Sequence, residues 1–190
     1  MLLWPSAVHA ADARRADAAR LMNELMIGKA VGGEFTLSDA HGKSVRLSDF
    51  RGKLVLLYFG FTSCPDVCPT DLLAIAQAIK SLGKDSEAIQ PVFITLDPER
   101  DTREIIGAYA ASFHPKFVAL TGSTSQIRDV AKAYKVFFEK VPMPGSNTYT
   151  VDHSAFTFLL DKEGRDIGLF PPGTPPERIA AIVREEIGKF

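Results

Sequence analysis

The chain contains two cysteines, and both lie in one short segment, Cys64-Pro65-Asp66-Val67-Cys68. Two neighbouring sulfurs can form a disulfide, exchange disulfides with other thiols, or bind a soft metal ion. Three residues separate these sulfurs, one more than in the two-residue spacing of thiol oxidoreductases. The wider spacing favours an ion held between the sulfurs, although it still permits a disulfide.

The residues around the pair predict a strand-to-helix turn. The apolar run 54–59 is typical of a buried strand, and residues 72–82 carry apolar side chains at helical spacing. Proline is well tolerated at the first position of a helix, so we expect the helix to begin at Pro69 with Cys68 as its cap. Unpaired backbone N–H groups at a helix start favour thiolate over thiol. The turn therefore suits reactive sulfur.

Three interpretations of the cysteine pair remain open on spacing alone. A structural disulfide would close a very small loop, which removes little entropy from the unfolded chain. A dithiol redox site would use the same two sulfurs. A metal site would need a further ligand, because two thiolates leave the shell incomplete; structural zinc, for example, takes four ligands.

Alternating strand and helix patterns predict an α/β domain. Strand-like runs at 54–59, 91–96 and 117–120 are separated by helical segments long enough for parallel crossovers. A further strand at 154–160 is followed by an antiparallel partner at 165–170 and by a last helix. This change from parallel crossovers to a terminal hairpin and helix is the thioredoxin-like arrangement, a three-layer α/β/α sandwich.

Three segments carry additional local predictions. Residues 34–37 and 44–47 alternate apolar and polar types around a glycine turn, which predicts an added N-terminal β-hairpin, a two-stranded flap ahead of the main sheet. A helix over 102–113 is expected to be capped by Asp101. Residues 140–151 contain proline, glycine and serine, and we expect a loop there.

Four histidines are candidates for a third ligand. Three of them are typical of surface residues, in the leader, in a hairpin turn and at a helix end: His9, His41 and His114. His153 differs, because it lies at the entrance of the strand expected beside the cysteine-bearing strand. Thioredoxin-like proteins usually carry a cis-proline there, whereas here no proline adjoins His153. Two thiolates and one imidazole suit copper, since thiolates select Cu(I) and imidazole also binds copper.

Composition limits the classes of function. The chain has 190 residues, 46% of them hydrophobic and 24% charged, which is ordinary for one globular domain. A formal net charge of −1 without a long basic run argues against nucleic acid and against anionic lipid as partners. No segment approaches the roughly 20 apolar residues of a membrane helix.

The first thirty residues are expected to stand apart from the domain. Val8-His9-Ala10 resembles a signal-peptidase site, so residues 1–10 are a clipped signal, the stump of an anchor or an unrelated leader. Residues 11–30 have the pattern of an amphipathic helix that joins this leader to the domain. The expected division is therefore a leader and linker over 1–30 and one thioredoxin-like copper-binding domain over 31–190.

Four motifs in order resemble the Sco (SenC) family of copper proteins that assist assembly of cytochrome c oxidase. The motifs are Gly52-Lys53, Tyr58 to Pro69, Leu96 to Thr102, and Val151-Asp152-His153-Ser154. The resemblance implies that Cys64, Cys68 and His153 bind copper, as Cu(I) or Cu(II), and that the two cysteines also form a redox pair. Asp152, beside the histidine, and Asp97, at the end of the central strand, are candidates for supporting the ligands.

The resemblance also implies partners and a location. The acceptor would be the copper-site subunit of cytochrome c oxidase, with another copper chaperone or a thiol reductant upstream. Family members face the periplasm or the mitochondrial intermembrane space, and many are tethered by an N-terminal membrane helix. We therefore expect a periplasmic protein, tethered to the inner membrane only if an anchor precedes this sequence.

Two classes of activity remain open. A copper metallochaperone would deliver the metal or prepare the oxidase's thiols, whereas a thiol–disulfide oxidoreductase would use Cys64 and Cys68 catalytically. A thiol peroxidase is a weaker third interpretation, because it needs an arginine near an activated cysteine and the cysteine turn contains none.

Overall fold

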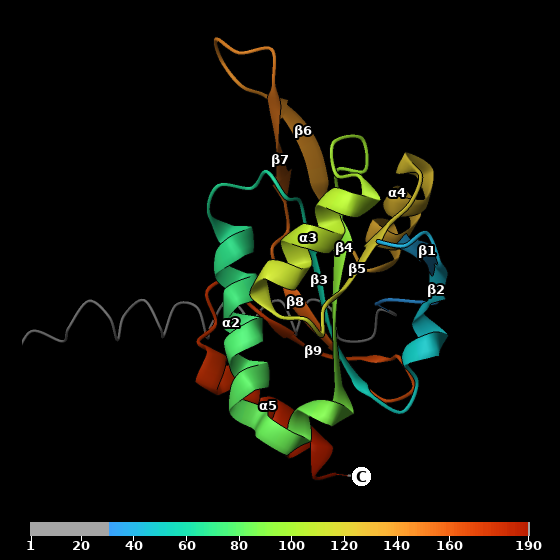
Figure 1. The fold of residues 1–190 in the computed structure, drawn as a ribbon, viewed down its shortest axis with the longest axis vertical. Coiled ribbons are helices and arrows are strands. Elements are labelled where there is room, and N and C mark those ends of the chain that lie inside the picture. Colours follow the sequence, from blue (N-terminus) through green and yellow to red (C-terminus); the bar gives the residue numbers. More distant parts are fainter. Residues whose placement is uncertain (1–30, 190) are drawn as a thin grey trace, which may run out of the picture.

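A computed structural model describes residues 31–189 of the chain. These residues form a seven-stranded sheet with helices on both faces, and a separate two-stranded hairpin projects from one end (Figure 1). Within this part of the chain, no helix combines the length and the apolar character needed to cross a membrane. The expected leader and amphipathic helix at 1–30 lie outside the described residues.

The strands of the large sheet are short and largely buried: β1 (Thr36–Asp39), β2 (Ser44–Arg46), β3 (Leu54–Gly60), β4 (Ile89–Thr95), β5 (Val118–Thr121), β8 (Thr157–Leu160) and β9 (Asp166–Phe170). The projecting hairpin is made of two strands: β6 (Phe138–Pro142) and β7 (Tyr149–His153). The helices follow the strands in turn: α2 (Val67–Leu82), α3 (Arg103–Phe113), α4 (Thr124–Ala133) and α5 (Pro176–Ile187), with short 3-10 segments η1 (Leu47–Phe50) and η2 (Gly83–Ala88).

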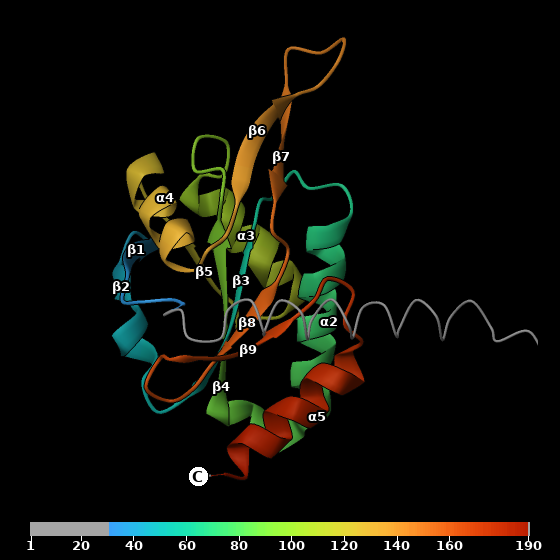
Figure 2. The same ribbon diagram turned by 180° about the vertical axis from the view of Figure 1, so that it is seen from behind.

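The sheet has the strand order β2-β1-β5-β4-β3-β8-β9. Strands β3, β4 and β5 are parallel, and β8 pairs antiparallel to β3 with β9 beyond it. Helices α2 and α3 cover one face and α4 lies over the other (Figures 1 and 2), while α5 packs against α2. The predicted thioredoxin-like three-layer α/β/α sandwich is confirmed.

Aromatic side chains fix the central strands from both faces. Phe59 of β3 has its ring 5.5 Å from that of Tyr134 and 5.9 Å from that of Phe158. On the opposite face, Phe93 of β4 lies 5.6 Å from the Tyr109 ring of α3. Because neighbouring side chains along a strand point to opposite faces, β3 is packed on both sides and buried along its whole length. Its carboxyl end is therefore a rigid base for the cysteine turn.

The N-terminal hairpin is part of the main sheet and not a separate flap. Strands β1 and β2 pair as expected, but β1 also pairs antiparallel with β5 through Ser38 and Thr121. This pairing extends the sheet by two strands and covers the edge of β5. The reason lies in the tertiary structure, since the unpaired N–H and C=O groups of an edge strand favour a further strand.

The loop expected over 140–151 is wrong for half of its length. Residues 138–142 pair with 149–153 as an antiparallel ladder, and the turn is confined to 143–148. The backbone N–H of Met143 donates to the Thr148 oxygen at 3.0 Å and closes this turn. The proline, glycine and serine do mark the turn, but of the strands on either side only Val151 is buried, so neither strand has the strong apolar run of a core strand.

Candidate metal centre

The cysteine turn follows directly from the end of β3. The strand ends at Gly60, the chain turns through residues 61–66, and α2 begins at Val67. The helix therefore starts before Pro69, and Cys68 lies inside its first turn, where we expected it to be the cap. Proline fits here because the first N–H groups of a helix have no partner within the helix.

The two sulfurs lie beside each other at this helix start. The backbone N–H of Cys68 donates to the Cys64 sulfur at 3.4 Å, so an unpaired helix N–H is satisfied by a sulfur. Both cysteines are free thiols; Cys64 is half-buried and Cys68 is fully buried. Cys64 is therefore the cysteine of the pair that remains partly exposed to solvent.

His153 reaches the cysteines from the last residue of β7. Its Nε2 atom lies 3.4 Å from the Cys68 sulfur, and its ring meets Phe61 edge-on at a centroid distance of 5.8 Å. Its Nδ1 atom lies 3.1 Å from the carbonyl oxygen of Ser154. A carbonyl oxygen only accepts hydrogen bonds, so Nδ1 carries a hydrogen, and Nε2 is the ring atom that faces the sulfur.

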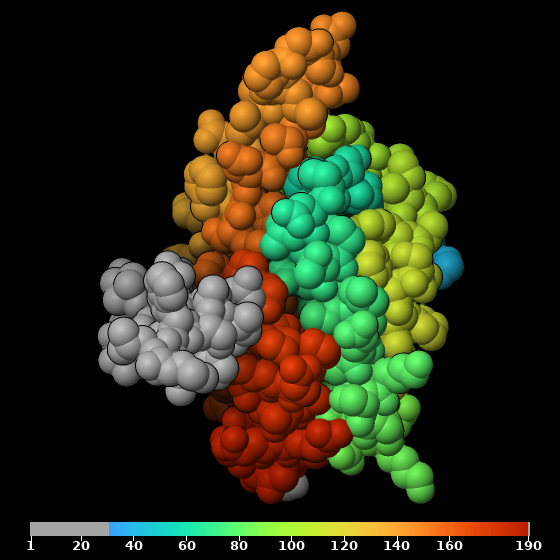
Figure 3. Space-filling model, turned by 90° about the vertical axis from the view of Figure 1, so that its left-hand side faces the viewer, coloured from blue at the N-terminus to red at the C-terminus, as the bar shows by residue number. Residues whose placement is uncertain are grey.

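The structure brings together the three residues that the sequence singled out. The ligand atoms of Cys64, Cys68 and His153 all lie within 4.8 Å of one another. Figure 3 shows the segment that carries the cysteines against the β7 segment at the surface. Two sulfurs and one imidazole nitrogen form a soft donor set of the kind that copper prefers.

The thiols of the cluster differ in acidity. Hydrogen bonding from the Cys68 thiol lowers the pKa of Cys64 well below its ordinary value, and His153 and the backbone N–H groups of Asp66 and Cys68 act in the same direction against the effect of burial. The Cys64 sulfur and burial both raise the pKa of Cys68. The metal-free pair therefore holds one thiolate and one thiol, so binding a metal to both sulfurs releases a proton.

Two polar groups that the sequence did not single out lie under Cys68. Asp71 is 5% exposed and accepts a hydrogen bond from the Gly173 N–H at 2.7 Å; burial raises its pKa to about 6. The Tyr58 hydroxyl is buried with no hydrogen-bond partner within normal distance, and burial raises its pKa. The burial of Tyr58 agrees with the buried strand expected over 54–59. The partner of Asp71 lies 102 positions away, so a helical pattern alone gives no signal for that contact.

The two acidic residues named as supporting candidates do not touch the cluster. Asp152 is exposed on β7, and the orienting contact of the imidazole is with the Ser154 carbonyl oxygen instead. Asp97 follows the end of β4, at the expected edge of the sheet. It is fully buried and accepts hydrogen bonds from Arg100 and Tyr149.

The cap predicted for α3 is also corrected. The side chain of Thr102 accepts the hydrogen bond from the Ile105 N–H and caps this helix. Asp101, the expected cap, is 1% exposed and accepts hydrogen bonds from Thr62 and Thr95. Its carboxylate serves the cysteine turn, because Thr62 stands two residues before Cys64.

A thioredoxin-like domain with two free cysteines and a histidine gathered at the end of its central strand belongs to the class of small soft-metal or thiol-redox proteins. More narrowly, the chain belongs to the SCO1/SenC family, whose profile matches residues 24–188. The motifs in the sequence indicated this family, and the match confirms it.

Three known proteins illustrate the likeness. The SCO2-like protein RP587 of Rickettsia prowazekii is 48% identical over 82% of this chain and 77% of its own length. The structure of Arabidopsis thaliana ScoI with copper bound has a TM-score of 0.79 and 38% identity, covering 85% of this chain and all of that one. A third structure, of BsSco, has a TM-score of 0.64 and 25% identity over 83% of this chain and 93% of its own. BsSco is described as having a disulfide switch and as a member of the Sco family of cytochrome c oxidase assembly proteins.

Proposed function

We propose that this protein binds one copper ion through Cys64, Cys68 and His153 and delivers it during assembly of cytochrome c oxidase. The observation that carries the proposal is the approach of these three ligand atoms to within 4.8 Å. Two thiolates favour Cu(I), while the imidazole also suits Cu(II). Three ligands also suit a metal that must leave again, because an incomplete shell admits an incoming ligand.

The roles of the three ligands differ in this proposal. Cys64 is already a thiolate and is half-buried, so it is the first sulfur to meet the metal and the first that an acceptor can displace. Cys68 binds next and loses its proton. His153 presents its Nε2 atom to the metal, because the Ser154 oxygen accepts a hydrogen bond from Nδ1 and so orients the ring.

The proposed acceptor is the copper-site subunit of cytochrome c oxidase, whose own thiolates would take the metal by ligand exchange. The donor would be another copper chaperone, and a thiol reductant would keep the cysteines reduced. We place this exchange in the periplasm. The family likeness and the description of BsSco as a cytochrome c oxidase assembly protein support the choice of acceptor.

A second function has its own support in the unequal acidity of the two thiols. The Cys64 thiolate would attack a disulfide of the acceptor, forming a mixed disulfide and releasing one acceptor thiolate. Cys68 would then displace the second acceptor sulfur, which leaves a Cys64–Cys68 disulfide and a fully reduced acceptor. This reaction prepares the acceptor's thiols but removes the copper site, so the two functions exclude each other in one molecule at one time.

Transfer to an acceptor tests the proposal. The reduced protein is loaded anaerobically with one equivalent of Cu(I) and mixed with the soluble copper-site domain of the oxidase subunit, and copper in the separated proteins is measured. We expect most of the metal to move to the reduced acceptor and none to an acceptor whose thiols are alkylated. Retention of copper by the donor in both mixtures would contradict the delivery role.

A further inference from the structure

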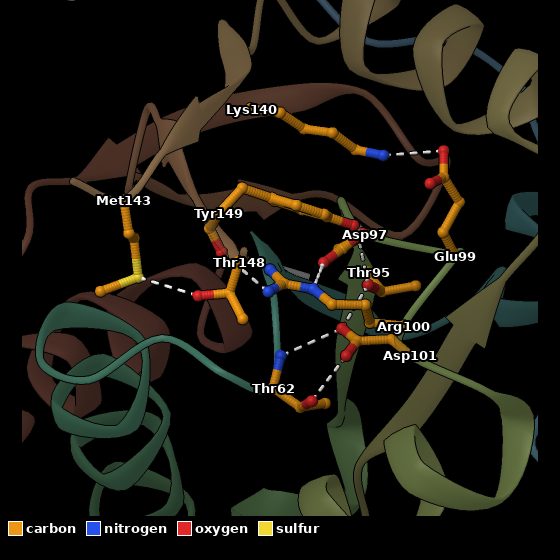
Figure 4. Close-up of polar contacts among 10 residues, drawn as sticks. All are labelled: Thr62, Thr95, Asp97, Glu99, Arg100, Asp101, Lys140, Met143, Thr148 and Tyr149. Carbon is orange, nitrogen blue, oxygen red and sulfur yellow. Dashed lines mark hydrogen bonds and ion pairs between the residues drawn. The ribbon is translucent and has the colours of Figure 1, made fainter. Parts of the chain in front are cut away.

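One loop, residues 97–101 between β4 and α3, contacts both the cysteine side and the histidine side of the metal centre. Figure 4 shows its side chains, with Thr62 of the cysteine turn on one side and Tyr149 of β7 on the other. The loop carries two buried carboxylates, Asp97 and Asp101, and the half-buried Arg100 between them. Buried charges are costly unless fully paired, so their presence here needs an explanation.

Asp101 holds the cysteine side. Its carboxylate accepts hydrogen bonds from the Thr62 N–H at 3.0 Å and from the Thr62 hydroxyl at 2.5 Å. A third bond comes from the Thr95 hydroxyl at 2.6 Å. Hydrogen bonds to an ionised carboxylate are roughly twice as strong as neutral ones. They fix the start of the turn that ends in Cys64 and Cys68.

Arg100 and Asp97 hold the histidine side. The Arg100 guanidinium binds the Asp97 carboxylate, donates to the Tyr149 carbonyl oxygen at 2.8 Å, and lies 3.8 Å above the Tyr149 ring. The Tyr149 hydroxyl donates to Asp97 at 2.8 Å. Tyr149 is the first residue of β7, the strand that ends in His153.

The β6–β7 hairpin needs such an attachment. Its two strands pair only with each other and form a sheet of their own among the described residues. Val151 of β7 packs into the hydrophobic core. Besides the contact of His153 with Cys68, three polar contacts join the hairpin to the rest of residues 31–189: two made by Tyr149 and an ion pair of Lys140 with Glu99 at 2.7 Å. Each of the three ends on the 97–101 loop.

We propose that the 97–101 loop sets the distance between the cysteines and the imidazole, Asp101 acting through Thr62 and Arg100 acting through Tyr149. Ligand groups must be held within about 0.5 Å of their working geometry to bind well. Because one loop contacts both the cysteine turn and the β6–β7 hairpin, it fixes the positions of these two segments relative to each other. This inference rests on the proposed copper function and adds Arg100, Asp101 and Tyr149 to it as positioning residues.

The first test compares copper affinity in matched variants. We expect Asp101→Asn and Arg100→Lys each to weaken Cu(I) binding at least tenfold, measured anaerobically against a competing chelator. The control is Asp161→Asn, since Asp161 is 4% exposed and also accepts three hydrogen bonds, from Glu163 and Arg165, but lies in the β8–β9 turn. The proposal would be overturned if Asp161→Asn weakened Cu(I) binding as much as Asp101→Asn and Arg100→Lys do, or if neither of these two variants weakened it.

A second test asks whether Arg100 acts through the imidazole. In a His153→Ala background, Arg100→Lys should weaken Cu(I) binding less than twofold further, because there is no imidazole left to misplace. Asp101→Asn should still weaken it in that background, since it acts on the sulfurs. An undiminished effect of Arg100→Lys without the imidazole would show that Arg100 has only a general structural role.

A third measurement needs no copper and separates this inference from the proposed function. In the metal-free protein, Arg100→Lys should shift the NMR resonances of the His153 ring and speed amide exchange over residues 149–153 about tenfold. Asp161→Asn should do neither. If the wild-type protein takes up no copper, the proposed copper function fails, but the positioning role of Arg100 is not affected. If the His153 resonances of Arg100→Lys are the same as those of the wild-type protein, the positioning role is overturned.

Discussion

The Cys68 sulfur lies 3.4 Å from the Nε2 atom of His153, although the two residues are 85 positions apart. Cys68 follows the central strand β3, and His153 precedes β8, which pairs antiparallel to β3. The carboxyl end of β3 and the amino end of β8 therefore lie at the same edge of the sheet. The pairing of these two strands is what brings the imidazole to the sulfurs.

Replacing the imidazole should separate copper binding from thiol chemistry. We expect His153→Ala to weaken copper binding by at least a hundredfold, because two sulfurs remain as the only protein ligands. Disulfide exchange with a small-molecule disulfide should stay within a few-fold of the unchanged protein. A variant that still binds copper with full affinity would remove His153 from the site.

The Cys64 thiol should behave as a thiolate throughout the neutral range, since its pKa is lowered to about 4, chiefly by the Cys68 thiol. In the reduced, metal-free protein, iodoacetamide should modify Cys64 before the buried Cys68. The rate at Cys64 should be nearly constant from pH 6 to 8, whereas an ordinary thiol with a pKa near 8.5 reacts roughly tenfold faster per pH unit. Mass spectrometry of the two peptides gives both rates, and a tenfold rise per unit at Cys64 would contradict the assignment.

The sequence was sufficient for those parts of the fold that depend on burial. The runs at 54–59 and 91–96 are strands buried on both faces, and their apolar composition alone predicts them. The cluster of Cys64, Cys68 and His153 was also predictable, because the chain has only two cysteines and because His153 directly precedes a strand-like run.

The remainder depends on contacts between distant segments. The β6–β7 hairpin is stabilised by pairing between its two strands, by the burial of Val151 and by contacts with the 97–101 loop. Contacts between distant segments leave no periodic signal in the sequence. The sequence does not reveal the role of Asp101, because its partner Thr62 lies 39 positions away. An aspartate just before a helix is also typical of a helix cap, and this local explanation was sufficient to account for Asp101.

A methyl group at Gly60 should disturb the cysteine turn. A Cβ atom there would lie 2.9 Å from the Cys68 sulfur and 2.9 Å from the Tyr58 ring, closer than such atoms pack. We expect Gly60→Ala to lower the free energy of unfolding by about 1–3 kcal/mol and to weaken copper binding several-fold. Gly168→Ala is the matched control, since no atom lies within 4 Å of its Cβ position. The free energy of unfolding is measured in urea, and copper affinity is measured by competition with a chelator. Equal effects of Gly60→Ala and Gly168→Ala on both quantities would contradict the crowding argument.

The buried Asp71 should make stability depend on pH. Burial raises its pKa from 3.8 to about 6, so the folded state binds more protons than the unfolded state between these values. The contribution of Asp71 to the free energy of unfolding is therefore most favourable below about pH 4. It falls by up to about 3 kcal/mol as the pH rises through about 6.

The variant Asp71→Asn cannot titrate and still offers an oxygen to the Gly173 N–H. Its free energy of unfolding, measured in urea relative to the unchanged protein, should become more favourable as pH rises from 4 to 7. The exposed Asp85→Asn serves as the control for the chemical change from aspartate to asparagine. A difference for Asp71→Asn that stays constant, or that changes in the opposite direction, would contradict the raised pKa.

The central claim, that two sulfurs and one imidazole form a single copper site, is tested most directly by spectroscopic titration. Reduced protein is titrated anaerobically with Cu(II), and the thiolate-to-Cu(II) charge-transfer absorption is followed in the unchanged protein and in Cys64→Ser, Cys68→Ser and His153→Ala. We predict saturation at one equivalent, with the band lost in each cysteine variant and shifted and weakened in His153→Ala. No uptake near one equivalent, or an unchanged band without His153, would contradict the account.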